Sequence, residues 1–186
     1  LTGLLPDIST DPAIETATDS IEAGRSGTIV APVGIRPPLL AAVATRAATP
    51  LVVLTATGRD AETLTNALAS WIPGVAMLPA WETLPHERLS PQVDTMARRI
   101  AVLRRLVHPV AGDESAGPIS VLVVPIRAFL QPIISGLADL EPVRVRTGDI
   151  LDLTDVTNRL AELGYERVDM VEGRGQMSVR GGILDV

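Results

Sequence analysis

The chain has 186 residues, of which 46% are hydrophobic and 20% are charged, and its formal net charge is −6. This composition supports a hydrophobic core and excludes a disordered protein. All 16 basic residues are arginines and there is no cysteine, which excludes a phosphate-loop lysine, a lysine nucleophile, disulfides and thiolate metal sites. The acidic balance disfavours nonspecific nucleic-acid binding. No apolar run reaches the roughly 18 residues of a membrane span, so we expect a cytoplasmic protein without membrane contact.

Helical and strand patterns alternate along the first two thirds of the chain. Helices are predicted at residues 11–23, 39–49, 59–71, 91–107 and beyond Pro125, the fourth with Ser90 as its N-cap. Short apolar or β-branched runs predict buried strands at residues 27–31, 51–55, 75–78 and 119–124. This alternation predicts an α/β layer with a parallel sheet.

The pattern changes after Glu141. Residues 143–146 and 166–170 alternate with period two, and a helix ended by Gly164 is predicted between them at 152–163. A turn and a further strand at 177–180 complete a β-α-β-β pattern of antiparallel style. We therefore predict three parts: an α/β domain over 1–140, a small α+β domain over 141–181, and the start of a return strand over 182–186.

The turn at 31–38 stands where a nucleotide-binding α/β domain carries GxxxxGK[ST], whose backbone N–H groups and lysine hold phosphates. Only Gly34 matches this motif. Pro37 and Pro38 occupy the lysine and Ser/Thr positions, and each lacks a backbone donor. The sequence therefore predicts a degenerate phosphate loop and no cofactor for this chain.

No other group of residues forms a catalytic or metal-binding pattern. His86 and His108 are the only histidines, and neither has a companion at ligand spacing. Glu82 and Glu87 form a conceivable acid–base pair without a nucleophile or oxyanion donor nearby. Ser178 has no histidine or aspartate at a suggestive spacing. We expect no catalytic residues and no metal site.

Arginines are concentrated near the end of the chain, with Arg167, Arg174 and Arg180 inside fourteen positions. Side chains alternate along a strand, so Ser178 and Arg180 are expected to face away from Met177. We expect the arginines to lie on one exposed face of a small sheet. Such a face is either a docking surface, since arginine favours interfaces, or a solvated surface.

Two separated motifs resemble the amino-terminal region of the bacterial transcription-repair coupling factors, the Mfd family. The first is WETLP at 81–85, followed by LSP at 89–91. The second is GYERV at 164–168 with VRGGILD at 179–185, which is similar to UvrB of nucleotide excision repair as well. The resemblance extends from about Gly27 onward. It implies a helicase-like α/β domain with a decayed nucleotide site and a small inserted domain that docks on UvrA.

The resemblance also assigns roles to single residues. Arg167 and Arg180 correspond to arginines through which the UvrB docking domain contacts UvrA, and Arg174 lies between them. A third arginine of the UvrB pattern is replaced by Ser178. Met177 stands where relatives have an aromatic residue, and it is expected either to touch the partner or to lie under the sheet. The partner-binding residues implied are therefore Arg167, Arg174, Met177, Ser178 and Arg180. UvrB's DNA-clamping hairpin has no room here, because the chain passes directly from LSP into a helix.

The function implied is a non-catalytic recruitment module that docks UvrA at stalled transcription complexes. In the family this surface is masked by a carboxy-terminal domain, and ATP, magnesium, DNA and RNA polymerase bind through other regions. Two alternatives remain open. One is a nucleotide-dependent helicase or ATPase half-domain; the other is nucleic-acid binding through Arg98, Arg99, Arg104 and Arg105.

Overall fold

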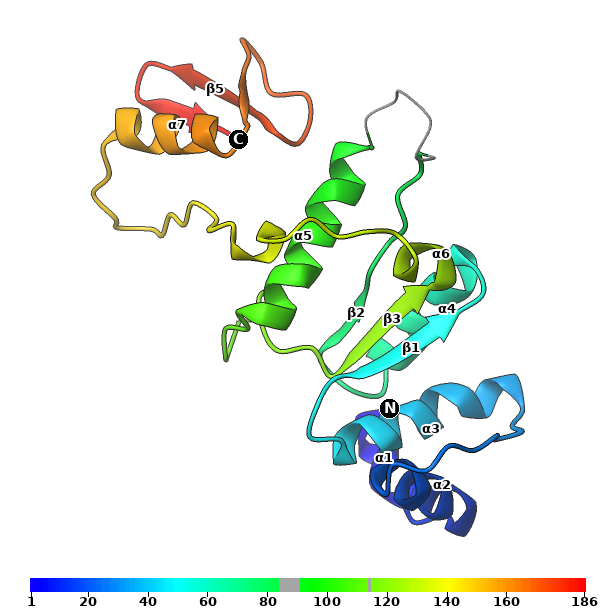
Figure 1. The fold of residues 1–186 in the computed structure, drawn as a ribbon. Coiled ribbons are helices and arrows are strands. Elements are labelled where there is room, and N and C mark those ends of the chain that lie inside the picture. Colours follow the sequence, from blue (N-terminus) through cyan, green and yellow to red (C-terminus); the bar gives the residue numbers. More distant parts are fainter. Residues whose placement is uncertain (84–90, 114) are drawn as a thin grey trace. The chain divides into compact units, whose positions relative to one another are not determined.

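The computed structural model describes residues 1–83, 91–113 and 115–186, which form two compact units (Figure 1). The first unit comprises Leu1–Pro91 and Thr95–Asp139, and the second comprises Gln92–Asp94 and Leu140–Val186. Each unit contains a three-stranded sheet. The α/β class predicted from the sequence is confirmed.

The sheet of the first unit is parallel, as predicted. Its strands are β1 (Leu51–Thr55), β2 (Val75–Met77) and β3 (Val121–Pro125), in the order β1-β3-β2. All five residues of β3 are buried, because the strand is flanked by a neighbour on each edge and covered on both faces. A continuous apolar run is the pattern typical of such a strand.

Helices cover the two faces of this sheet. One core joins Val121 and Val123 of β3 to α1 (Leu5–Ser9), α2 (Pro12–Glu22), α3 (Arg36–Arg46) and α4 (Gly58–Ala69). The other joins Leu122 and Val124 to α5 (Val93–Val107) and α6 (Ile126–Phe129). Among the described residues of this unit, short 3₁₀ turns lie at Thr2–Leu4, Val33–Ile35 and Leu137–Asp139. None of the described helices has the length and apolarity of a membrane span.

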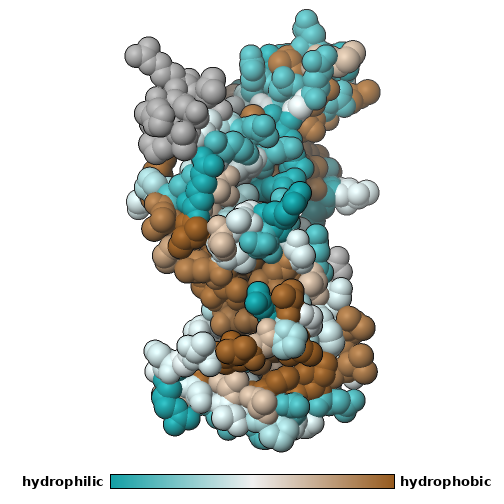
Figure 2. Space-filling model, turned by 90° about the vertical axis from the view of Figure 1, so that its right-hand side faces the viewer, coloured by the Kyte–Doolittle hydropathy of each residue, from teal (hydrophilic) through white to brown (hydrophobic). Residues whose placement is uncertain are grey.

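The strand predicted at 27–31 is wrong. These residues form no strand in the structure, and Ile29 and Val30 are 51% and 95% exposed. A β-branched run becomes a strand only when a neighbouring strand accepts and donates its backbone hydrogen bonds, and no described strand lies beside this one. Other apolar side chains of the first unit are also exposed, among them Val52 and Leu54 of β1, and Figure 2 shows hydrophobic residues at the surface.

The second unit contains α7 (Leu153–Glu162) beside a mixed sheet of β4 (Glu166–Arg167), β5 (Gln176–Arg180) and β6 (Ile183–Asp185). Asp152 precedes the helix and caps it, because its carboxylate accepts hydrogen bonds from the N–H groups of Thr154 and Asp155. It ends before Gly164, whose φ of 87° is readily adopted only by glycine.

The strand pairing of this unit differs in part from the prediction. Strand β6 pairs with β5 antiparallel, but the antiparallel arrangement predicted for 166–170 and 177–180 is wrong, because β4 pairs with β5 in parallel. Residues 168–175 carry the chain back along the sheet before β5 begins, so both strands run in the same direction. Residues 143–146 form no strand, although their sequence alternates with period two.

Candidate docking surface

Three exposed arginines of the second unit lie on different segments. Arg167 ends β4, Arg174 lies in the 168–175 connection, and Arg180 ends β5. An Nη2 atom of Arg180 is 3.5 Å from a carboxylate oxygen of Asp185. Nε of Arg174 is 2.7 Å from a carboxylate oxygen of Asp94, a residue of the same unit. Arg167 forms no ion pair with any described residue, so its charge is the most available of the three.

The strand register separates these arginines. Arg167 is the register partner of Met177, and register partners project from the same face of a sheet. Met177 and Arg180 are an odd number of positions apart on β5, so they project from opposite faces. The prediction of one shared arginine face is therefore wrong, because β4 pairs in parallel with a register that the sequence does not reveal.

Two neighbouring residues of β5, Met177 and Ser178, are internal. Met177 is 4% exposed and Ser178 is 1% exposed. The hydroxyl of Ser178 donates a hydrogen bond of 2.9 Å to the backbone carbonyl of Asp169. The expectation that Ser178 faces solvent beside Arg180 is thus wrong, because the central strand of this sheet is covered on both sides.

Sequence reasoning missed Gln176, the first residue of β5. Its side-chain carbonyl accepts hydrogen bonds from the backbone N–H groups of Glu172 and Gly173, at 2.8 and 3.0 Å. The available signal was a glutamine directly after Gly175, a glycine with a φ of 83° that turns the chain into the strand. A side-chain amide there is well placed to satisfy the turn's own backbone donors.

The region expected to be a degenerate phosphate loop contains the start of α3. Gly34 lies in the 3₁₀ turn Val33–Ile35, and Pro37 and Pro38 lie in the first helical turn. Proline is well tolerated there because the N–H groups of a helix's first turn have no partner inside the helix. The same two prolines remove N–H groups that would otherwise point at an anion.

Among the described residues, no group of histidine, aspartate and glutamate side chains is arranged to hold a metal ion. His108 instead lies with Nε2 2.8 Å from a carboxylate oxygen of Asp139. His86, Glu87 and the N-cap residue Ser90 lie outside the described residues.

The described part of the WETLP motif, residues 81–83, lies beside a buried cation. The Arg99 side chain is 1% exposed, and its Nη1 donates a hydrogen bond of 2.6 Å to the carbonyl of Pro79. Burial lowers the pKa of Arg99. The hydroxyl of Thr95 donates to the carboxylate of Glu82, and Nη2 of Arg127 donates to the Glu82 carbonyl at 3.1 Å. These contacts are structural and leave Arg99 unavailable to a nucleic acid.

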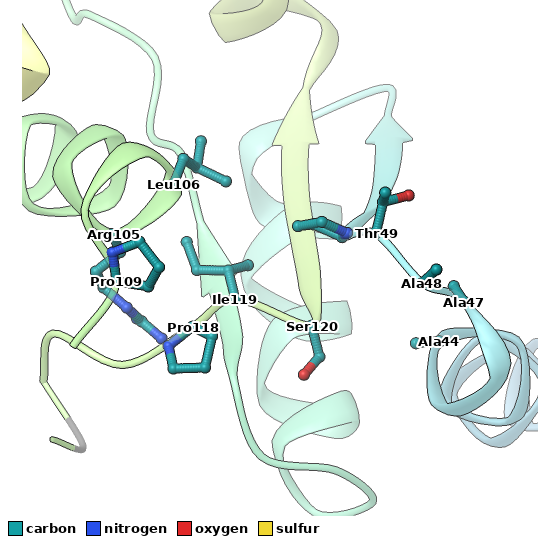
Figure 3. Close-up of a pocket in the computed structure, with 11 residues that line it drawn as sticks. Ala44, Ala47, Ala48, Thr49, Arg105, Leu106, Pro109, Pro118, Ile119 and Ser120 are labelled. Carbon is teal, nitrogen blue, oxygen red and sulfur yellow. The ribbon is translucent and has the colours of Figure 1, made fainter. Parts of the chain in front are cut away.

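A shallow cavity of about 350 Å³ lies beside the amino ends of β1 and β3 (Figure 3). Its walls are mainly alanine and proline, with Ser120 and Arg105 among the polar residues. Nε of Arg105 already donates to the carbonyl of Gly117 at 2.9 Å. Ligands of parallel α/β sheets bind at the opposite, carboxyl ends of the strands, so this cavity offers no recognisable binding chemistry.

Comparison with known proteins decides the family. A model of the UvrB interaction domain matches residues 143–186. The transcription-repair-coupling factor of Mycobacterium tuberculosis is 48% identical over 161 residues, which is 86% of this chain and 13% of that protein. The chain belongs to the transcription-repair-coupling factor family. The Bacillus subtilis member is 29% identical over 175 residues, which is 92% of this chain and 14% of that protein.

The chain is also similar to UvrABC system protein B over a short part of its length. The UvrABC system protein B of Vibrio vulnificus is 45% identical over 58 residues, 28% of this chain and 9% of that protein. The matched segment 143–186 contains α7, the mixed sheet and, among its arginines, Arg167, Arg174 and Arg180. The chain is thus a coupling-factor region that carries a UvrB-type interaction domain.

Proposed function

We propose that this region of a transcription-repair-coupling factor is a non-catalytic recruitment module that docks UvrA through its second unit. One observation carries the proposal: the match to the UvrB interaction domain coincides with the segment that exposes Arg167, Arg174 and Arg180. An exposed guanidinium without an ion pair, as in Arg167, is ready to form a bidentate pair with a partner's carboxylate.

The division of labour within the chain is part of the proposal. Residues 1–140 form a helicase-like scaffold without a working phosphate loop, 141–181 form the docking domain, and 182–186 add strand β6 to its sheet. Pro37 and Pro38 support the absence of ATP turnover, since they remove phosphate-binding N–H groups. ATP, magnesium, DNA and RNA polymerase would bind other regions of a cytoplasmic coupling factor, and a carboxy-terminal domain would mask the docking surface.

A binding titration of the chain against purified UvrA tests this function. Arg167→Glu and Arg180→Glu are measured separately, because the two side chains project from opposite faces of the sheet. Arg144→Glu, a reversal at another exposed arginine of the same unit, is the matched control. We expect at least one of the first two reversals to weaken binding about tenfold or more with unchanged thermal stability.

Two results would contradict the proposal. One is no binding of UvrA by a folded wild-type chain. The other is an equal loss of affinity in all three reversals, which would indicate a diffuse charge effect instead of a docking surface. Calorimetric titration with ATP and magnesium tests the non-catalytic part separately, and measurable hydrolysis would favour a helicase half-domain.

A further inference from the structure

The 168–175 connection of the second unit is tied to β5 by two side chains. Gln176 accepts the backbone N–H groups of Glu172 and Gly173, and the hydroxyl of Ser178 donates to the carbonyl of Asp169. Gln176 and Ser178 are alternate residues of one strand and therefore lie on the same face. Both ends of the connection are thus fixed to that face of the sheet.

Backbone hydrogen bonds hold only the two ends of residues 168–175. The N–H of Glu166 donates to the carbonyl of Gly175 at 2.8 Å, and the N–H of Val168 donates to the carbonyl of Met177 at 2.9 Å. From Val168 to Gly175 the chain forms no helix or strand. The side chains of Gln176 and Ser178 supply the hydrogen bonds that define the shape of the connection.

Such fixing matters for Arg174, which the connection carries. A segment that is already ordered before binding loses less conformational entropy when a partner engages it. Ser178 is 1% exposed and cannot reach a partner without reorganisation of the unit. Ser178 therefore acts on the shape of residues 168–175 through its hydrogen bond to Asp169, and not through direct contact with a partner.

We propose that Gln176 and Ser178 are positioning residues, which hold residues 168–175 in the conformation that the docking partner recognises without contacting it themselves. The inference rests on the proposed function, and it adds a determinant of affinity that is not an arginine. It also gives a role to the serine that replaces an arginine of the UvrB pattern: an internal hydrogen bond takes the place of an external contact.

The test compares Gln176→Met with Gln176→Glu in the 186-residue chain. Methionine preserves length and shape but removes the acceptor, whereas glutamate retains an oxygen for both N–H groups. In Gln176→Met we expect faster hydrogen exchange at the amides of Glu172 and Gly173, and UvrA binding weakened roughly three- to tenfold. Gln176→Glu should retain slow exchange and near wild-type affinity. Ser178→Ala should resemble Gln176→Met, with faster exchange around Asp169.

Exchange and binding together separate the outcomes. Unchanged exchange in Gln176→Met overturns the inference. Faster exchange with unchanged affinity also overturns it, if Arg167→Glu or Arg180→Glu weakens binding in the same assay. If the wild-type chain does not bind UvrA at all, the proposed function has failed and with it the partner-recognition part of the inference, while the exchange rates still decide whether Gln176 orders the connection.

Discussion

The guanidinium carbon of Arg99 lies 4.4 Å from the centre of the Trp81 ring. This contact joins the middle of α5 to the segment after β2, and Nη1 of Arg99 holds the carbonyl of Pro79 on the same segment. In the folded protein the Arg99 guanidinium contacts the Trp81 ring face and the Pro79 carbonyl in place of water. The first half of the WETLP motif is therefore part of the packing of the first unit.

Replacement of Arg99 tests the importance of this buried contact. Arg99→Met keeps the apolar stem but leaves the Pro79 carbonyl without its donor, and we expect the free energy of unfolding to fall by about 1–3 kcal/mol. Arg98→Met, at the exposed neighbouring position, should change it by less than about 0.5 kcal/mol. Denaturant unfolding of both variants provides the measurement, and equal effects would contradict a special role for Arg99.

The N-cap of α7 makes the second unit sensitive to acid. Hydrogen bonds from the backbone N–H groups of Thr154 and Asp155 lower the pKa of Asp152 below its usual value. The folded state therefore binds this proton less readily than the unfolded state. Its stabilising contribution is present above the unfolded pKa of about 4 and is lost as the pH falls through the lower folded value.

Asp152→Ala should accordingly reduce the thermal stability of the second unit at pH 7, and the deficit relative to wild type should shrink near pH 3. Asp155→Ala, which removes a carboxylate from the same helical turn without removing the cap, should cost less at pH 7. Melting curves followed by far-UV circular dichroism at both pH values decide the matter. A deficit that stays constant with pH would show that the carboxylate charge is irrelevant.

Arg46 joins two helices of the first unit. Its guanidinium contacts both carboxylate oxygens of Glu22 at 2.7 and 2.8 Å and one oxygen of Asp19 at 2.8 Å. The hydrogen bond to Glu22, followed by that to Asp19, raises the pKa of Arg46. We expect Arg46→Gln to accelerate amide exchange in α2 more than in α4, and added salt to reduce the difference. Uniform acceleration across the unit would contradict this local role.

Asp185 competes with an outside partner for Arg180. Their side chains lie 3.5 Å apart, and both are exposed. Asp185→Asn removes this internal competitor, so affinity for a partner that offers a carboxylate should increase roughly two- to fivefold. Asp169→Asn, at another exposed carboxylate of the unit, should have no such effect. A decrease in affinity in Asp185→Asn would mean that the internal pair instead presents Arg180 in its binding geometry.

The elements predicted well are those whose sequence carries its own signal. Strands β1, β2 and β3 are continuous apolar runs, and α7 has a capping aspartate at one end and a stopping glycine at the other. The run at 27–31 carries the same strand signal, but a strand also needs a partner edge, which no local pattern can supply. A local strand pattern is therefore not sufficient for a strand.

The candidate site was predictable as a set of residues but not as a geometry. The motif identified Arg167 and Arg180, and the clustering of arginines added Arg174. The structure places all three at the surface of one unit. The sequence could not reveal that β4 pairs in parallel with β5, and this pairing puts Arg167 and Arg180 on opposite faces. The burial of Ser178 depends on where residues 168–175 cross the sheet, which is a tertiary relationship.

The strand order of the first unit also constrains how the protein is made. Strand β3 comes last along the chain but lies between β1 and β2, which do not pair with each other. A nascent chain that has emerged only as far as β2 therefore contains two strands that form no sheet. Their apolar faces stay unpaired until residues 121–125 have emerged. Folding of this unit on the ribosome is thus expected to occur in one late step, because its central strand closes contacts across long stretches of sequence.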